Sequence, residues 1–559
     1  MTLEAFVELF EPADLHVAQR LTTLAKDEDP SVALAVALAV RALRGGSVCV
    51  DLRSVADQTG VPDLPWPAPD QWLATVQASP LAAEKVLRVQ GDLLYLDRYW
   101  REEQQVCDDI LALLSAPPRP VVPAAERLFP AGWEEQRAAA EVALRQSLTV
   151  LTGGPGTGKT TTVARLLAAI ADQADGAPPR MALAAPTGKA AARLQDAVAA
   201  EVGRLDAVDQ ARLAGLTATT LHRLLGSLPD TSSRFRHHRG NRLPHDVIVV
   251  DETSMVSLTM MARLLEAVRP DVRLLFVGDP DQLASVDAGA VLADLVDGLG
   301  DPGVVELRTS HRFGETIGAL AQAIRSGDAD ATVDLLREGG DAVAWLDTDD
   351  PAEELRPALV ARAAELREAA LLGDAASALA VLDGHRLLCA HRSGPYGVAH
   401  WNRRIERWLA DKTGQAMWSQ WYPGRPLLVT ANDYGLGVYN GDTGVVVAAR
   451  DGLRAHIGSA RGSLQFAPGR LGEVETMFAM TIHKSQGSQA DEVTVLMPPE
   501  DSRLLTRELF YTAVTRAKKR IQVVGTEASV RAAVGHRAVR ASGLARRLRD
   551  HGKVTITAG

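Results

Sequence analysis

Short apolar runs followed by helical segments dominate the chain beyond residue 136. Such runs, four to six residues long here, are typical of buried parallel strands in βαβ units. The first group of runs lies at 148–151, 181–185, 247–250 and 272–277. A second group follows at 386–390, 492–497 and 520–524. The pattern therefore predicts an α/β protein with two parallel-sheet domains.

The first part of the chain has a different pattern. Residues 1–115 are rich in Ala and Leu at helical spacing and show no recognisable catalytic motif. A proline-rich stretch follows at 116–123, where the prolines remove hydrogen-bond donors and keep the chain extended. A chain of 559 residues is also too long for one hydrophobic core. We therefore expect a helical N-terminal domain over 1–115 and a linker over 116–123.

Composition is that of an ordinary globular protein, with 46% hydrophobic and 23% charged residues. The net charge of −10 predicts that any nucleic-acid contact is local, because a protein that coats DNA is usually basic. The cysteines Cys49, Cys107 and Cys389 lie far apart, which fits a reducing compartment and excludes a zinc cluster built mainly from cysteine. The chain starts without a basic segment, and its apolar runs are too short to span a bilayer. We expect a cytoplasmic protein.

A glycine-rich loop lies between the first predicted strand and the next helix. Its glycines let backbone N–H groups face a phosphate, while Lys159 reaches the β- and γ-phosphates and the Thr160 hydroxyl binds Mg²⁺. The order of strand, loop and helix is the context that this motif requires, so a purely structural glycine loop is the weaker interpretation. The predicted ATP-binding residues of the loop are Gly153, Gly154, Pro155, Gly156, Thr157, Gly158, Lys159, Thr160 and Thr161.

Two further predicted strands end in polar residues that suit phosphoryl transfer. Asp251 would hold Mg²⁺, directly or through water, and Glu252 would polarise the attacking water. Two such acids can also cap a helix, an interpretation that loses force beside a phosphate loop. Gln282 follows the next strand, where its amide could sense the γ-phosphate and orient water; a plain Gly-Asp-Pro turn is the alternative. These residues together predict an NTPase with ATP and Mg²⁺.

Four motifs in the chain resemble those of superfamily-1 helicases. They lie at 251–255, 278–282, 480–487 and 511–517. The resemblance implies two RecA-like parallel-sheet domains with ATP between them. The second domain would provide Arg312 and Arg516 to the γ-phosphate, and Gln136 would bind adenine. A single arginine is usually a surface residue, but both of these lie inside matched motifs.

The same resemblance implies contacts with single-stranded DNA. Hydroxyl groups, lysines and free N–H groups at helix starts can hold backbone phosphates without reading the base sequence. The expected DNA-binding residues are Pro186, Thr187, Lys189, Thr219, Thr220, His222, Asn440, Thr481, His483 and Lys484. For Thr219 and Thr220, a helix cap is an equally good interpretation. The basic run at 234–239 is expected to form a strand-separating pin, with a solvated loop as the alternative.

Within these helicases, the chain resembles the RecD family, the alpha subunits of the RecBCD enzyme, in a form of actinobacterial type. The resemblance covers roughly 124–526 and is most specific at 185–194, 221–226, 391–398 and 432–444. It implies 5′→3′ movement on single-stranded DNA, action at duplex ends, and RecB and RecC as partner subunits in a nucleoid-associated complex. The N-terminal domain would contact RecC. The chain shows no nuclease motif, so exonuclease activity is expected only of the complex.

The resemblance also implies a domain plan. The first RecA-like domain would span 124–309, with the pin inserted at about 226–244. The second would comprise 310–445 and 476–559. An SH3-like β-barrel insertion would occupy 446–475.

Three alternatives remain open on the sequence. The chain could be a stand-alone RecD-like or accessory DNA helicase that needs neither RecB nor RecC. It could be an NTP-dependent switch that binds DNA without moving along it. It could also unwind RNA, because phosphate contacts alone do not distinguish the two sugars.

Overall fold

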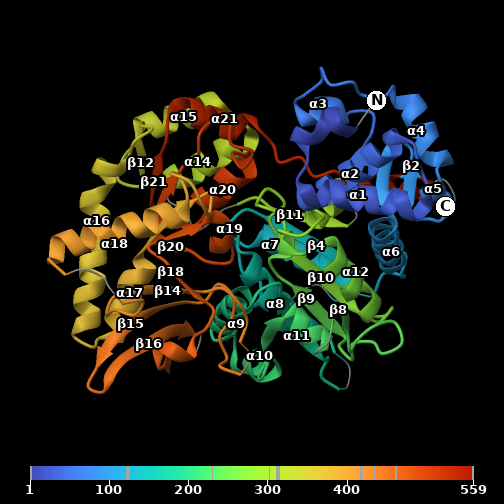
Figure 1. Ribbon diagram of the computed structural model, residues 1–559. Helices are drawn as coiled ribbons and strands as arrows, with labels where there is room; N and C mark the ends of the chain where they lie inside the picture. The colour runs from blue at the N-terminus through green and yellow to red at the C-terminus, as the bar shows by residue number, and fades with distance from the viewer. Residues whose placement is uncertain are drawn as a thin grey trace.

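The computed structural model consists of two α/β lobes and a smaller N-terminal domain (Figure 1). It describes residues 3–120, 122, 126–174, 177–228, 231–300, 303–309, 315–415, 419–433, 435–459 and 462–556. The predicted α/β class is confirmed, since both lobes are built on parallel sheets. Among the described residues, no helix is both long enough and apolar enough to cross a membrane.

The first lobe contains a six-stranded sheet in the order β11-β4-β10-β9-β5-β6, in which neighbouring strands are parallel. Its strands are β4 (Leu148–Gly153), β5 (Met181–Ala185), β6 (Ala218–Thr220), β9 (Val247–Val250), β10 (Arg273–Gly278) and β11 (Val304–Leu307). The central strands β4 and β9 are buried along their whole length, because helices cover both faces. Neighbouring residues point to opposite cores: Val150 packs with one hydrophobic cluster and Leu151 with another.

The helices of this lobe follow its strands along the chain, except for the first, which precedes β4. They are α7 (Glu134–Arg145), α8 (Lys159–Asp172), α9 (Gly188–Val202), α10 (Ala207–Arg212), α11 (Leu221–Leu225), α12 (Leu258–Ala267) and α13 (Val291–Leu299). A short hairpin of β7 (Ser227–Leu228) and β8 (Thr231–Phe235) follows α11, inside the segment expected to form the pin.

The second lobe contains a five-stranded parallel sheet in the order β12-β21-β20-β13-β19. Its strands are β12 (Val343–Leu346), β13 (His385–Cys389), β19 (Ala479–Thr481), β20 (Ala490–Leu496) and β21 (Ala517–Val524). Its helices are α14 (Glu315–Ser326), α15 (Ala329–Glu338), α16 (Ala352–Leu371), α17 (Ala375–Gly384), α18 (Val398–Thr413), α19 (Ile482–Ser485), α20 (Arg507–Val514) and α21 (Glu527–Gly535). The three strands predicted in this region are strands of this sheet, with ends shifted by a few residues.

An antiparallel sheet with the order β17-β16-β15-β14-β18 adjoins the second lobe. Its strands are β14 (Pro426–Val429), β15 (Thr443–Ala449), β16 (Gly452–Ser459), β17 (Gly462–Phe466) and β18 (Val474–Thr476). The sheet begins at Pro426, ahead of the expected start of the insertion at 446. Its first strand along the chain, β14, pairs with both β15 and the last strand, β18.

The N-terminal domain is mainly helical and has a core of its own around Phe6 and Trp72. Its principal helices are α1 (Pro12–Ala25), α2 (Pro30–Arg44), α4 (Pro69–Ala78) and α6 (Asp97–Leu114). A small sheet of β1 (Val50–Asp51), β2 (Leu87–Gln90) and β3 (Leu93–Leu96) completes the domain. These strands have two to four residues, too few for an alternating pattern to reveal them in the sequence.

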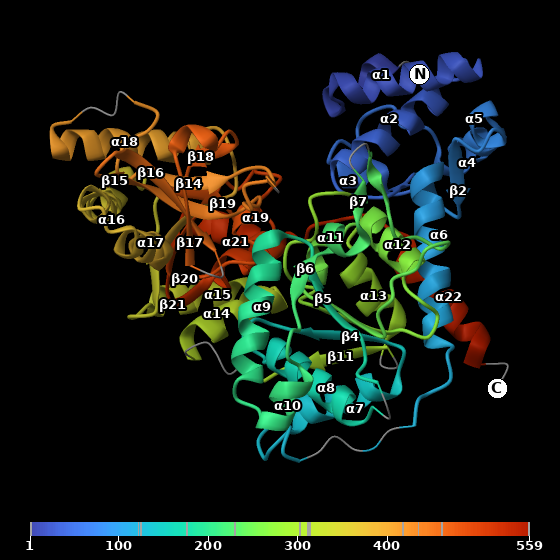
Figure 2. The same cartoon turned by 90° about the horizontal axis from the view of Figure 1, so that it is seen from below.

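The C-terminal segment does not stay with the second lobe, where the expected plan put it. Beyond α21 the chain crosses back, and α22 (Leu544–Ile556) packs against α13 and α6 (Figure 2). A buried ion pair fixes this helix: Arg547 donates from Nε to Oε1 of Glu103 on α6 over 2.8 Å. The Gly543 N–H and the Tyr95 hydroxyl also donate to the Glu103 carboxylate. The N-terminal domain, the first lobe and the C-terminus are therefore packed as one unit.

Candidate nucleotide and DNA sites at the lobe boundary

The glycine-rich loop joins β4 to α8 at the carboxyl edge of the first sheet. Gly156 and Gly158 both have φ of +84°, a left-handed conformation that glycine adopts without strain. The Lys159 ammonium folds over the loop, contacts the carbonyl oxygen of Gly153 and donates to that of Gly154 at 2.9 Å. Burial lowers the pKa of Lys159, opposed by the nearby carboxylates of Asp279, Glu252 and Asp251. A lysine bound only to two carbonyl groups is ready to exchange them for phosphate oxygens.

The two candidate acids follow β9 directly. The Asp251 N–H donates to the Ala184 carbonyl at 2.9 Å, so the neighbouring strand β5 fixes the backbone here. Burial and the adjacent Glu252 raise the pKa of Asp251 to about 6, and a bound cation would favour its charged form. Glu252 has φ of 50° and ψ of 42°, a left-handed conformation that costs about 1–3 kcal/mol for a non-glycine residue. Such strain is common where a side chain must point at a reaction centre.

The proposed Mg²⁺ ligands suit that ion chemically. Thr160 would provide a hydroxyl and Asp251 a carboxylate, both hard oxygen donors. Within the part of the chain that the structure describes, no group of three or more His, Cys, Asp or Glu residues could hold a metal. Mg²⁺ is usually held by one or two protein oxygens together with substrate phosphates and water.

Arg516 crosses from the second lobe into this site. It follows the end of α20 and is 3% exposed. Its Nη2 donates to Oε1 of Gln282 in the first lobe at 2.9 Å, and its Nε donates to the Thr512 carbonyl at 3.0 Å. Burial lowers the pKa of Arg516, while Glu252 favours the charged guanidinium. The second expected arginine, Arg312, lies outside the described residues.

Two residues that the sequence analysis did not select also link the lobes here. The Tyr511 hydroxyl donates to Oδ2 of Asp279 at 3.1 Å and lies beside Gly154 of the loop. Tyr511 stands in the same motif as Arg516, so that motif could have indicated it. Arg325 on α14 donates to Asp281 over 2.5 Å and to Glu306 over 2.8 Å. No motif marks Arg325, and only the packing of the lobes reveals its role.

The expected adenine-binding residue lies against the loop. Gln136 on α7 is 1% exposed and donates from Nε2 to the Thr157 carbonyl at 3.4 Å.

A cleft of about 470 Å³ opens at the boundary between the lobes, within the size range of ligand pockets in proteins. It is lined by Asp281, Glu306, Arg308, Gln322, Arg325 and Ser326.

On the expected DNA side, three threonines begin helices. Thr187 caps α9, Thr220 caps α11 and Thr481 caps α19, each accepting from the N–H three residues later at 3.2 Å. The helix-cap interpretation therefore holds for Thr220. The buried hydroxyl of Thr219 has no hydrogen-bond partner among the described residues. Helix starts leave N–H groups available to a phosphate even when a threonine caps them.

The other expected DNA residues lie around these helix starts. The His222 ring packs edge-on against Phe235 at 5.7 Å between centroids, and burial lowers the pKa of His222. Burial also lowers the pKa of His483, and Lys484 lies 3.5 Å from the Glu475 carboxylate. Pro186 directly precedes Thr187 and is partly buried. The structure thus gathers these residues at the ends of β5, β6 and β19.

The two lobes touch directly at the start of α9. Lys189 donates to the Gly441 carbonyl at 3.5 Å, next to Asn440, whose N–H donates to the Asn432 side chain at 2.9 Å. Burial lowers the pKa of Lys189 to about 8. Gly188 packs so tightly on the Tyr439 ring that a β-carbon would lie 2.6 Å from it. Lys189 and Asn440 therefore meet across the lobe boundary.

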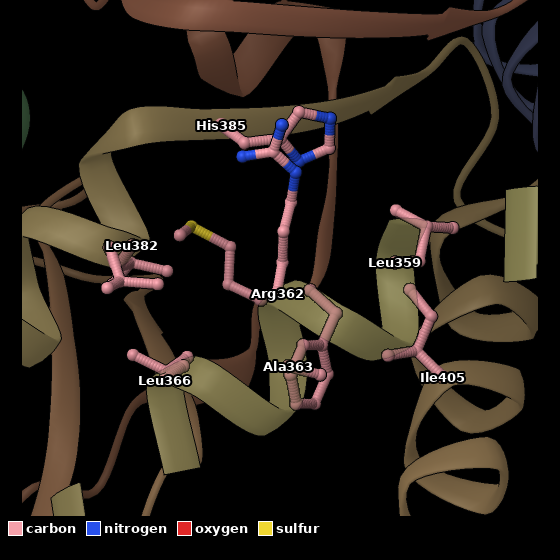
Figure 3. Close-up of a pocket in the computed structure, with 10 residues that line it drawn as sticks. Leu359, Arg362, Ala363, Leu366, Leu382, His385 and Ile405 are labelled. Carbon is pink, nitrogen blue, oxygen red and sulfur yellow. The ribbon is translucent and has the colours of Figure 1, made fainter. Parts of the chain in front are cut away.

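A separate cavity in the second lobe lies away from the boundary. It has a volume of about 40 Å³, room for only a few water molecules, and is enclosed by α16, α17, α18 and β13. Arg362 points toward His385 across it, and the remaining labelled residues are apolar (Figure 3). It is far too small for a nucleotide.

Comparison with protein-family models identifies three segments. Residues 133–347 match an AAA domain, and residues 476–524 match a UvrD-like helicase C-terminal domain. Residues 7–95 match the N-terminal domain of the RecBCD enzyme subunit RecD. The first match contains the glycine-rich loop and both candidate acids, and the second contains Arg516.

Similar proteins extend over nearly the whole chain. The RecBCD enzyme subunit RecD of Mycolicibacterium smegmatis is 72% identical over 554 residues, covering 98% of this chain and 99% of the relative. The RecBCD enzyme subunit RecD of Mycobacterium tuberculosis is 67% identical, covering 97% of this chain and 96% of the relative. An ATP-dependent RecD2 DNA helicase from Deinococcus radiodurans is 32% identical, covering 85% of this chain and 61% of the relative.

Proposed function

The chain belongs to the RecD family of RecBCD enzyme subunits, and from that premise we propose that it is an ATP-dependent DNA helicase that works within a RecBCD complex. We further propose that it moves 5′→3′ along single-stranded DNA at duplex ends and contributes to the repair of double-strand breaks by recombination. Exonuclease activity would belong to the complex.

The observation that supports this proposal most directly is the contact between Arg516 and Gln282. It joins the second lobe to the first, within the site formed by Lys159 and the two acids. An arginine from one lobe stabilises charge in the transition state only while the lobes are closed. Hydrolysis would therefore alternate with opening and closing of the boundary, as a motor requires.

Each residue has a role in the proposed reaction. The loop and Lys159 would bind the phosphates, and Gln136 would bind the adenine. Glu252 would activate the attacking water. The water oxygen bonds to the γ-phosphorus, and the bond from that phosphorus to the bridging oxygen breaks. ADP leaves with the electron pair, while the water proton passes to Glu252. Mg²⁺, held by Thr160 and Asp251, would neutralise phosphate charge when bound.

The helix starts at the boundary would grip the DNA. Backbone N–H groups at α9, α11 and α19 could bind successive phosphates, together with Lys189, Asn440 and Lys484. Because these groups bind the backbone, the bases would remain unread. Each cycle of closure would then shift one lobe relative to the strand.

Family membership also suggests partners and location. We propose RecB and RecC as the partner subunits, with the N-terminal domain contacting RecC. We also propose that the complex is cytoplasmic and associated with the nucleoid. The packing of α22 on α6 would make the N-terminal domain move with the first lobe.

Unwinding of forked DNA by the full chain tests direction. Forks with only a 5′ tail should be unwound in the presence of ATP and Mg²⁺, while forks with only a 3′ tail should remain intact. Unwinding from the 3′ tail alone would refute the proposed polarity. Strong DNA stimulation of ATP hydrolysis without strand separation would favour the non-translocating switch, and an RNA duplex in parallel tests the substrate.

Co-purification with RecB and RecC from the same source tests the subunit role. A stable three-chain complex is expected, and deletion of residues 3–95 from the chain should abolish it if the N-terminal domain makes the contact. Robust unwinding by a chain that binds neither partner would instead favour a stand-alone helicase.

A further inference from the structure

A third arginine faces the nucleotide site, and the proposed roles do not include it. Arg193 lies in the second turn of α9, the helix that begins at the expected DNA contact. Its side chain is 37% exposed, so it lies at the lobe boundary and not in a hydrophobic core. Its charge also influences Lys159 and Asp251 in the site.

Arg193 contacts both lobes. Its Nη1 lies 4.0 Å from Oε1 of Glu252, and its Nη2 donates to Oε1 of Gln489 at 3.2 Å. Gln489 belongs to the second lobe and follows Ser488, whose carbonyl accepts from Arg516 at 3.4 Å. The guanidinium thus connects the residue proposed to activate water with the segment that holds Arg516.

We infer that Arg193 is a positioning residue that directs the Glu252 carboxylate toward the attacking water when the lobes close. The inference rests on the proposed ATP hydrolysis and adds a residue to it. Glu252 has a strained backbone, and within the part of the chain that the structure describes its ion-pair partner is Arg193. Arginine suits this task because its planar fork can bind a carboxylate and an amide oxygen at the same time.

The geometry favours positioning over direct binding of DNA or of phosphate. The guanidinium is engaged by a carboxylate of its own lobe and by an amide of the second lobe, and the contact with that amide depends on closure. A DNA-binding arginine would be expected to face the helix start at Thr187, more than a turn away along α9. Removing Arg193 should therefore slow the chemical step and leave both ligands bound.

The test compares Arg193→Ala, Arg193→Lys and Arg204→Ala in the full chain. Arg204 lies just beyond the same helix, with a side chain 71% exposed, and serves as the matched control. With single-stranded DNA present, Arg193→Ala should lower kcat for ATP about 10- to 100-fold, with KM for ATP and the Kd for DNA changed less than about twofold. Arg193→Lys should recover part of the loss, because it keeps the charge.

A double-mutant cycle with Glu252→Gln shows whether Arg193 acts through that residue. In a single-turnover assay, Arg193→Ala should cost little further activity once the carboxylate is gone. Gln489→Ala alone should give a smaller loss, and it should add little to Arg193→Ala.

Three outcomes would overturn the inference. They are an unchanged kcat, a raised KM or DNA Kd at an unchanged kcat, and a full additional loss in the Glu252→Gln background. Wild-type protein and Lys159→Ala are run beside these variants. If wild-type protein fails to hydrolyse ATP, the proposed function itself is wrong. If only the Arg193 variants behave like wild type, the positioning role alone is wrong.

Discussion

The two sides of the lobe boundary use different chemistry. On the nucleotide side, charged and hydroxyl side chains of one lobe reach specific side chains of the other, as Arg516 reaches Gln282 and Tyr511 reaches Asp279. On the expected DNA side, three threonines cap helices, and the lobes meet through a backbone carbonyl and a glycine.

This difference reflects what each ligand demands. Phosphoryl transfer needs a lysine, acids and arginines at fixed places, because each must meet charge that develops in the transition state. A grip on any DNA sequence needs only N–H groups aimed at phosphates, and many residue types can provide them. On the nucleotide side, replacing a single side chain should therefore reduce ATP hydrolysis strongly. On the DNA side, a substitution should have a smaller effect, and it should act by changing how the lobes fit together.

The largest effect is expected from Lys159→Ala. The Lys159 ammonium folds over the phosphate loop, so ATP turnover should fall at least about 1,000-fold without it. The thermal unfolding midpoint should stay near that of wild type. Phosphate release and a thermal melt measure the two quantities. Lys519→Ala, at a lysine 74% exposed, is the control. Turnover above a few per cent of wild type would count heavily against the site.

The second largest effect is expected from Arg516→Ala. Its kcat for ATP hydrolysis should be about 100-fold lower, because the positive charge that the second lobe contributes to the site is lost. KM for ATP should change far less. Arg516 and Gln282 bind each other, so the double variant with Gln282→Ala should lose less than the two single losses multiplied. Steady-state ATP hydrolysis with single-stranded DNA measures all three variants. Simple multiplication of the losses would mean that the contact is incidental to catalysis.

The sequence marks the nucleotide side more specifically than the DNA side, for the same chemical reason. A strand, a glycine loop and a helix in order identify Lys159, and a strand that ends in Asp251 and Glu252 identifies the acids. Arg325 escaped prediction because an arginine on an ordinary helix has no motif, and its partners Asp281 and Glu306 become neighbours only when two lobes pack. Arg193 lies within the segment 185–194 that resembles the RecD family, but its contacts with Glu252 and Gln489 likewise become apparent only in the folded structure.

The fold shows a similar division. Buried strands such as 247–250 are obvious because helices cover both faces and every residue is apolar. The crossing of the C-terminal segment to α6 was not predicted, since it rests on contacts between residues separated by most of the chain, such as the buried pair of Glu103 with Arg547. Contacts between residues so distant leave no periodic signal.

Gly188→Ala tests the DNA side through geometry alone. The new methyl group would lie 2.6 Å from the Tyr439 ring, so the lobes must separate slightly at the start of α9. We expect DNA-stimulated ATP hydrolysis to fall about tenfold, with ATP affinity in the absence of DNA nearly unchanged. Gly203→Ala, at the far end of the same helix, is the matched control. Adding Tyr439→Gly should restore activity, because the new methyl group at 188 would lie 2.6 Å from both the β-carbon and the ring of Tyr439. A Gly188→Ala variant with full activity would mean that this contact is dispensable.

The smallest effect is a pH dependence of DNA binding at Lys189. Burial lowers the pKa of this lysine to about 8 in the free protein, and a bound phosphate would raise it again. DNA binding would then take up a proton above pH 8, so affinity should fall as pH rises, by no more than about tenfold between pH 7 and pH 9. Fluorescence anisotropy at fixed salt concentration measures this. Lys189→Arg keeps its charge throughout the range, so its affinity should stay nearly level. An equal fall in the two proteins would mean that another group titrates and that Lys189 does not bind the strand.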